Sequence, residues 1–280
     1  MRLKFFALVA LSASSLAAQS SREQKAESRE PISKPIQDNS FLLEEAYNQE
    51  AAVVQHISTL FFDRRISTWL YALTDEWPLN GQRHQLSVTL PLENAVVGKG
   101  NSPALGDIAL NYRLQLVGSG ETRLAVAPRL TVLFPTAPEK VGGGTLAFQG
   151  AAASSYVATP RLALHTNAGL TLTPGGQTSV GGERLLDFYA GQSAIWLVHP
   201  RVNLMLEGVA TSTETLSATG ARARETGYTL SPGIRWAYNF ASGLQIVPGF
   251  AFPIGFNANR DQRAVLLYLS FEHVMPGLRK

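Results

Sequence analysis

The chain reads GDIALNYRLQL from Gly106 to Leu116, and apolar and polar residues alternate along this stretch. Successive side chains of a β-strand point to opposite faces, so the segment would have one apolar and one polar face. The apolar face would carry Ile108, Leu110, Tyr112, Leu114 and Leu116, and the other face Asp107, Asn111, Arg113 and Gln115. We therefore predict a strand whose two faces meet different surroundings.

The same alternation recurs from about Ser67 to Phe271 and predicts about twelve strands. They are expected at 53–62, 67–79, 83–92, 106–117, 122–135, 147–159, 161–173, 184–198, 201–215, 226–240, 243–256 and 263–274. These strands are long, since the commonest strand length in globular proteins is about 5–6 residues.

Short and long connections alternate along this pattern. Asn80-Gly81, Gly118–Glu121, Pro160, His199-Pro200 and 241–243 are short, whereas 93–105, 136–146, 174–183, 216–225 and 257–262 are longer. Outer-membrane barrels have short periplasmic turns and longer extracellular loops. An even number of strands would then place both chain ends in the periplasm.

The composition agrees with this interpretation. Only 16% of the 280 residues are charged, and the net charge of +3 comes without a Lys/Arg run, so a nucleic-acid partner is not expected. Arg2 and Lys4, an apolar run from Phe5 to Leu11 and small residues up to Ala18 predict a signal peptide at 1–18. The chain has no Cys, which excludes disulfides, thiolate metal sites and a lipid anchor on cysteine.

The predicted fold class is all-β: a transmembrane antiparallel β-barrel of about 12 strands at 51–280, with a short N-terminal periplasmic segment at 19–50. Within that segment, 38–47 could form one short helix with Leu43, Ala46 and Tyr47 on one face. One interpretation is a periplasmic tail with a fraying helix. The other is a plug that enters the barrel and narrows the pore.

The polar face of the strands would line the lumen. Its charged and titratable candidates are Asp107, Arg113, Arg129, His165, Asp187, Glu207 and Arg235. They could form a constriction with a positive bias that selects anionic or polar solutes. Alternatively, facing charges could pair and simply fill a narrow lumen. The residues leave both interpretations open.

Aromatic residues near the strand ends predict the belts that outer-membrane barrels place at the two membrane surfaces. The candidates are Trp69, Trp77, Trp196 and Tyr228. Aromatic residues at strand ends also occur in soluble sheets, so strand length and the loop pattern carry the membrane prediction.

Signals of catalysis are weak. The five His residues have no metal-ligand spacing, and neither a phosphate loop nor a calcium loop is present, so no metal or cofactor is expected. Ser193 and His165 would face inward on neighbouring strands, which is the one pair that an outer-membrane lipid hydrolase could use. We expect a protein that is not an enzyme.

The stretch PIQDNSFLLEEAYNQE from Pro35 to Glu50, followed by Val54–Ile57, resembles a family of bacterial outer-membrane proteins. That family is named for the meta-pathway of phenol degradation and is described as transporters. The ending Tyr268–His273 is similar to theirs as well. The resemblance covers roughly residues 31–275 and implies an outer-membrane barrel that passes aromatic or hydrophobic compounds. It supplies no site residues.

We therefore expect a monomeric passive channel for small molecules in a bacterial outer membrane, surrounded by lipid and inserted by the barrel assembly machinery. The alternative is a structural or adhesion barrel with no transport role. Phe271 would serve as the aromatic assembly signal from inside the chain, or a tail from Pro276 to Lys280 would follow it into the periplasm.

Overall fold

The computed structural model describes residues 39–65, 67–97, 100–138, 142–175, 183–217, 220–240 and 244–274. All of them belong to one compact unit. The expected signal peptide at 1–18, the first part of the expected periplasmic segment and the tail after Val274 lie outside the described residues.

The described residues form fifteen strands in one antiparallel sheet. The strands of the first half are β1 (Val53–Asp63), β2 (Thr68–Leu79), β3 (His84–Val97), β4 (Gly100–Leu105), β5 (Ile108–Leu114), β6 (Leu124–Phe134) and β7 (Ala147–Thr159). Those of the second half are β8 (Leu162–Thr173), β9 (Leu185–His199), β10 (Val202–Leu216), β11 (Arg222–Trp236), β12 (Tyr238–Asn239), β13 (Gln245–Ala251), β14 (Ile254–Asn257) and β15 (Ala264–Val274).

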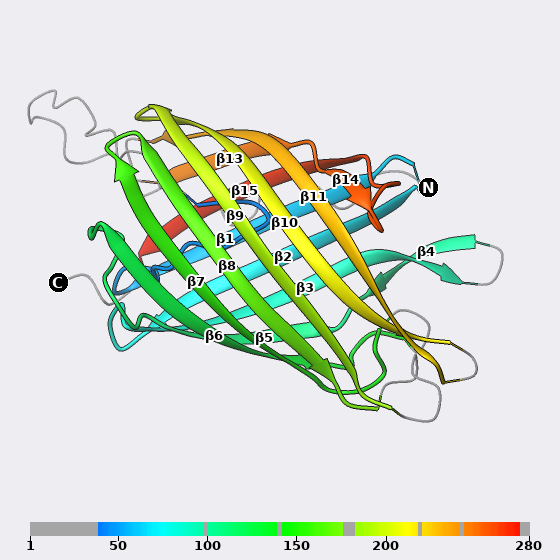
Figure 1. The fold of residues 1–280 in the computed structure, drawn as a ribbon. Coiled ribbons are helices and arrows are strands. Elements are labelled where there is room, and N and C mark those ends of the chain that lie inside the picture. Colours follow the sequence, from blue (N-terminus) through cyan, green and yellow to red (C-terminus); the bar gives the residue numbers. More distant parts are fainter. Residues whose placement is uncertain are drawn as a thin grey trace, which may run out of the picture. The chain divides into compact units, whose positions relative to one another are not determined.

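The sheet closes on itself, because β1 pairs with β15 along its whole length, from Val53↔Val274 to Asp63↔Ala264. The result is a 12-strand antiparallel β-barrel, in which β4 and β5, β11 and β12, and β13 and β14 each form one interrupted strand of the wall (Figure 1). The prediction of fold class is confirmed. We call the end with the short connections the short-turn end and the opposite one the long-loop end.

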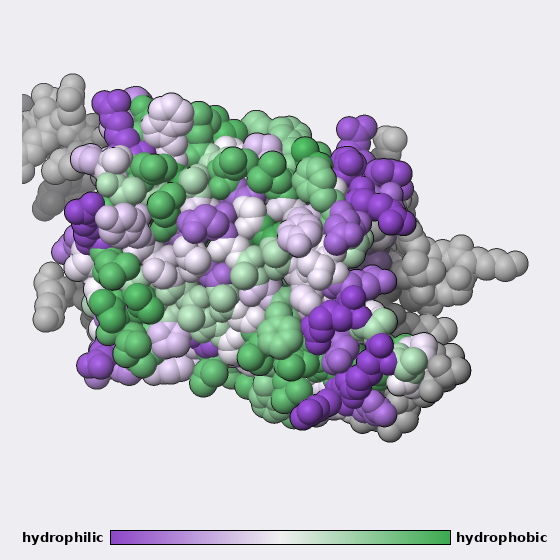
Figure 2. Space-filling model, in the orientation of Figure 1, coloured by the Kyte–Doolittle hydropathy of each residue, from purple (hydrophilic) through white to green (hydrophobic). Residues whose placement is uncertain are grey.

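The outer wall is apolar and the inner wall polar. Leu130, Trp196 and Leu267 are at least half exposed, at 66%, 56% and 50%, whereas Arg235 and Glu207 are buried. A soluble domain has the reverse arrangement, whereas a barrel that crosses a bilayer must present apolar side chains to lipid. Figure 2 shows apolar side chains on the outer wall and hydrophilic ones gathered at the long-loop end. The described residues include no helix that is long and apolar enough to cross a membrane.

Two local predictions were wrong. Residues 93–105 were expected to be a loop, but β3 continues to Val97 and pairs with β4 as a hairpin that extends beyond the wall at the long-loop end (Figure 1). The residues of this hairpin lack regular apolar alternation, so no strand was predicted there. The short helix suggested for 38–47 is not present in the described residues 39–47, and residues 39–50 follow an irregular path with bends.

Three prolines within strands stand where pairing on one side of the strand is interrupted. Opposite Pro128, the pairing of β5 and β6 changes register between the Arg113↔Arg129 pair and the Val117↔Val126 bridge. Pro232 and Pro248 lie beside the breaks between β13 and β14 and between β11 and β12. Because proline has no N–H to donate, each of these breaks accepts a proline at low cost.

Candidate functional site

Residues 39–50, which we call the inner segment, lie inside the barrel at its short-turn half. Asn39, Leu43, Ala46 and Asn48 are buried there although no strand includes them. Buried backbone N–H groups need hydrogen-bond acceptors, and an irregular segment cannot supply them from a ladder. The inner wall provides them from its polar side chains.

Glu207 on β10 accepts the first three of these N–H groups. Its Oε1 lies 3.2, 2.9 and 3.2 Å from the backbone nitrogens of Phe41, Leu42 and Leu43, and its Oε2 lies 3.2 Å from that of Phe41. Consecutive amides converging on one carboxylate form an anion nest, and hydrogen bonds to an ionised group are stronger than neutral ones. The buried carboxylate of Glu207 is thus compensated by the inner segment.

The following amides bind to successive strands around the wall. The N–H groups of Glu44, Ala46, Asn48 and Gln49 donate to Asn167 on β8 (2.9 Å), Ser155 on β7 (2.7 Å), Gln115 beyond β5 (2.9 Å) and Gln85 on β3 (2.7 Å). Asn167 also donates back to the carbonyl of Glu44 at 2.8 Å. The inner segment therefore runs as an arc across the strands, from β10 to β3, before it enters β1.

Apolar contacts accompany these hydrogen bonds. Phe41 packs against buried side chains of β13 and β15, and its ring centroid lies 4.9 Å from that of Tyr268. Ala46 and Tyr47 cover a buried alanine cluster formed by Ala125, Ala127 and Ala153. Small residues on the wall leave room for the inner segment, so its path is built into the barrel sequence.

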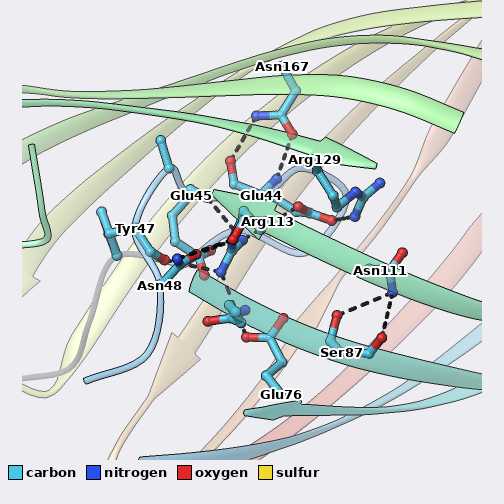
Figure 3. Close-up of polar contacts among 12 residues, drawn as sticks. Glu44, Glu45, Tyr47, Asn48, Glu76, Ser87, Asn111, Arg113, Arg129 and Asn167 are labelled. Atoms are coloured by element: carbon cyan, nitrogen blue, oxygen red, sulfur yellow. Dashed lines mark hydrogen bonds and ion pairs between the residues drawn. The ribbon is translucent and has the colours of Figure 1, made fainter. Parts of the chain in front are cut away.

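Arg113 and Arg129 meet the carboxylate of Glu44 (Figure 3). Arg113 Nη1 lies 3.5 Å from Glu44 Oε2, and Arg129 Nη1 pairs with Oε1. Arg113 also donates to Asn48 Oδ1 at 2.8 Å and to the carbonyl of Tyr47 at 3.1 Å. Arg113 thereby ties the inner segment to the wall, while Arg129 also donates to Gln149 at 2.6 Å.

Five of the predicted lumen residues come together around the inner segment: Arg113, Arg129, His165, Glu207 and Arg235. The sequence predicted their face but not their contacts. It also did not single out Gln85 and Ser155, which accept amides of the inner segment. Their inward parity was the available signal, although nothing in the sequence assigns a neutral polar residue to a particular partner.

Asp107 and Asp187 lie toward the long-loop end and bind backbone. Asp107 accepts the N–H groups of Ala137 at 3.1 Å and Gly143 at 3.0 Å, so it holds the two sides of one connection. Asp187 accepts the N–H of Glu214 at 2.8 Å, beyond the last paired residues of β9 and β10. Neither aspartate contacts the inner segment in these hydrogen bonds.

Of the four predicted belt residues, Trp69, Trp77 and Trp196 lie near strand ends of the wall, whereas Tyr228 lies near the middle of β11. Trp69 stands toward the long-loop end, and Trp77 and Trp196 stand toward the short-turn end. Trp196 and Tyr228 are 56% and 49% exposed. Their placement at the surfaces of a bilayer stays a prediction.

The arrangement offers little to catalysis. Ser193 and His165 face each other across β8 and β9, but both are fully buried beneath the inner segment. Ser193 Oγ is 2.8 Å from Ser40 Oγ, and His165 Nδ1 is 2.7 Å from Ser155 Oγ. In the part of the chain that the structure describes, no three His, Asp or Glu residues are grouped to bind a metal ion.

The fold is similar to that of solved outer-membrane channels. The COG4313 outer membrane channel from Pseudomonas putida F1 aligns over 88% of this chain and 100% of its own, with a TM-score of 0.54 and 14% sequence identity. The NanC porin aligns over 79% of this chain and 100% of its own, with a TM-score of 0.53 and 8% identity. At such identities the likeness concerns the fold.

No protein-family model matches the sequence, and no curated protein sequence matches it. The resemblance to the family named for phenol degradation is therefore supported only at the level of an outer-membrane channel fold.

Proposed function

We propose that this protein is a bacterial outer-membrane channel that passes small molecules passively, and that the inner segment is its gate. The short-turn end would face the periplasm and the long-loop end the exterior. The apolar outer wall and the polar inner wall support this function, as does the fold shared with solved outer-membrane channels. The channel would act as a monomer.

The proposal rests on the position of the inner segment in the lumen. A chain segment occupies its short-turn half, and this segment continues into the wall through Ala51 and Ala52. Its polar contacts reach side chains of β3, β5, β7, β8 and β10 without forming part of the barrel ladder. It could therefore leave the wall while every strand pair of the barrel stays intact.

The long-loop half of the lumen supports a solute path. Several inward-facing side chains there are uncharged and remain partly accessible to solvent: Leu70, Thr89, Leu133, Thr171, Thr211 and Thr229. Asp107 and Asp187 also lie toward this end, where they accept backbone N–H groups. The cationic side chains Arg113 and Arg129 lie beside the inner segment and pair with its Glu44. A solute would thus pass uncharged side chains, together with two aspartates that bind backbone, before it met the gate.

A reversible disulfide tests whether the inner segment closes the channel. Ser40 Oγ and Ser193 Oγ are 2.8 Å apart, and the chain contains no Cys, so the double variant S40C/S193C can form one disulfide between the inner segment and β9. We expect ion conductance in planar bilayers under reducing conditions and its loss on oxidation. The single variants S40C and S193C should show no redox response.

Removing the inner segment distinguishes a channel from a structural barrel. A variant without residues 39–49 should conduct steadily if it still shows the heat-modifiable migration of a folded barrel. If this variant is folded and does not conduct, and the reduced double variant does not conduct either, the channel proposal is wrong and a structural or adhesion role is favoured.

A further inference from the structure

Arg113 and Arg129 stand directly opposite each other on neighbouring strands, as a register pair of β5 and β6. Both side chains point into the lumen, where they meet Glu44 (Figure 3). Like charges directly opposite each other destabilise a sheet, and partial burial strengthens the repulsion. This part of the wall therefore favours an anion between the two guanidinium groups.

The anion that contacts both guanidinium groups is Glu44, which belongs to the inner segment, whereas Glu76 on β2 lies 3.9 Å from Arg113 Nη2. The side chain of Glu44 is 36% exposed and that of Arg129 is 18% exposed, whereas that of Arg113 is only 4% exposed. Solvent thus reaches the Glu44–Arg129 contact. In addition, Arg129 Nε is buried and has no hydrogen-bond partner among the described residues, so this donor is unused there.

Arg129 also lies on the lumen side that a solute from the long-loop end would reach. The inner segment covers Ala125 and Ala127 on β6, and Arg129 is the next inward residue along that strand. Beyond it the inward face of β6 carries Thr131 and Leu133, which are neutral. A solute moving inward along β6 would meet Arg129 before it met the covered alanines.

We propose that the Arg113–Arg129 pair is a binding site for the carboxylate of a small organic acid, and that Glu44 is a tethered occupant which such a solute displaces. Arginine matches a carboxylate with two parallel hydrogen bonds, so the pair can exchange one carboxylate for another. Displacing Glu44 would remove an attachment of the inner segment and favour its release. The idea of a released gate rests on the function proposed above, whereas carboxylate binding does not.

Glu44 competes at a high local concentration because it is attached to the wall through a short chain, so a free acid is expected to bind weakly. The neutral residues beyond Arg129 offer no second cationic group on β6. The site therefore suits a monocarboxylate with a small body. We choose butyrate as the probe and butyramide, which has the same shape without the charge, as its control.

The test measures how fast a thiol reagent reaches a cysteine at position 40. Ser40 is buried in the inner segment, and S40C would be the only thiol in the chain. We expect saturating butyrate to raise the rate at which a hydrophilic maleimide labels S40C in the folded barrel by about tenfold, equal to about 1.4 kcal/mol. Butyramide, and sodium chloride at the same ionic strength, should leave the rate unchanged.

Two further variants locate the effect. In S40C/R129Q the response to butyrate should disappear, whereas S40C/R123Q should respond as S40C does, because Arg123 lies over Tyr156 at the short-turn end. In E44Q, which lacks the tethered competitor, isothermal titration should show butyrate binding about tenfold more tightly than in the unmodified chain. The same titration with R129Q should show no binding.

An equal response to butyrate and butyramide would overturn the proposal, as would a response to butyrate that persists in S40C/R129Q. Conductance decides the other question separately. If butyrate binds and exposes position 40 but the folded variant without residues 39–49 does not conduct, then the carboxylate site stands and the channel proposal fails. If that variant conducts and butyrate has no effect on the full chain, then the channel proposal stands and the carboxylate site fails.

Discussion

The ring of Phe41 occupies space that is free only because residue 249 is glycine. A Cβ atom at Gly249 would lie 2.6 Å from Phe41 Cζ, closer than real Cβ atoms approach any heavy atom. The same holds for Leu43, since a Cβ atom at Gly191 would lie 2.7 Å from its Cδ2. Missing side chains on β9 and β13 thus shape a seat for the inner segment.

Substituting Gly249→Ala should loosen the inner segment. Overpacking of a close contact costs about 1–3 kcal/mol. Phe41 can relieve the closest contact by leaving its seat, while the contact of 2.8 Å with Arg235 Cβ must be relieved by a small shift of the wall. We expect S40C/G249A to react with a hydrophilic maleimide about tenfold faster than S40C. The matched control is Gly208→Ala on β10, where a Cβ atom would meet nothing within 4 Å. Similar labelling rates in the two glycine variants would contradict the claim that Gly249 makes room for Phe41.

Glu207→Gln should loosen residues 41–43 of the inner segment. The amide retains one acceptor oxygen but loses the charge that three N–H groups share, and its own NH₂ group would be buried beside them. The expected cost is about 2 kcal/mol, on the scale of hydrogen bonds to charged groups. In planar bilayers the variant should open more often than the unmodified barrel, with the same conductance in each opening. An unchanged opening frequency would mean that Glu207 does not hold the gate.

Removing Glu44 should cost more than removing Arg129. In E44Q the opposed Arg113 and Arg129 lose the anion between them, whereas in R129Q the repulsion disappears together with the ion pair. We expect E44Q to be the less stable variant by roughly 0.5–1 kcal/mol, the size of an unfavourable cross-strand pair. Urea unfolding of both variants in lipid vesicles would measure the difference, and added salt should reduce it.

Asp107→Ala should act locally at the long-loop end. Asp107 accepts the N–H groups of Ala137 and Gly143, so its loss frees two amides without touching the inner segment. We expect faster hydrogen exchange at these two amides and no change in the labelling of S40C. Glu121→Ala removes a carboxylate at the opposite end and serves as the control. Faster labelling of S40C in D107A would show that the two ends of the lumen are coupled.

The sequence predicted the wall well because the physics of the wall is local. Alternation of side chains follows from the strand itself, and the short connection at Asn80-Gly81 follows from turn chemistry, with Asn80 and Gly81 both at positive φ (50° and 101°). The hairpin of β3 and β4 was missed, because backbone pairing there needs no apolar face. The expected helix at 38–47 was wrong because its amides bind Glu207 and other wall side chains, which no local rule includes.

The inner segment shows the difference most clearly. The sequence by itself determined that Arg113, Arg129, Glu207 and Arg235 face the lumen, since parity along each strand decides which side a residue takes. Only the tertiary structure decided that these charges serve residues 39–50. The register of β5 and β6 places Arg113 opposite Arg129, and closure of the barrel brings Glu44 between them. Parity is a property of one strand, whereas a lumen contact exists only once all the strands have closed around it.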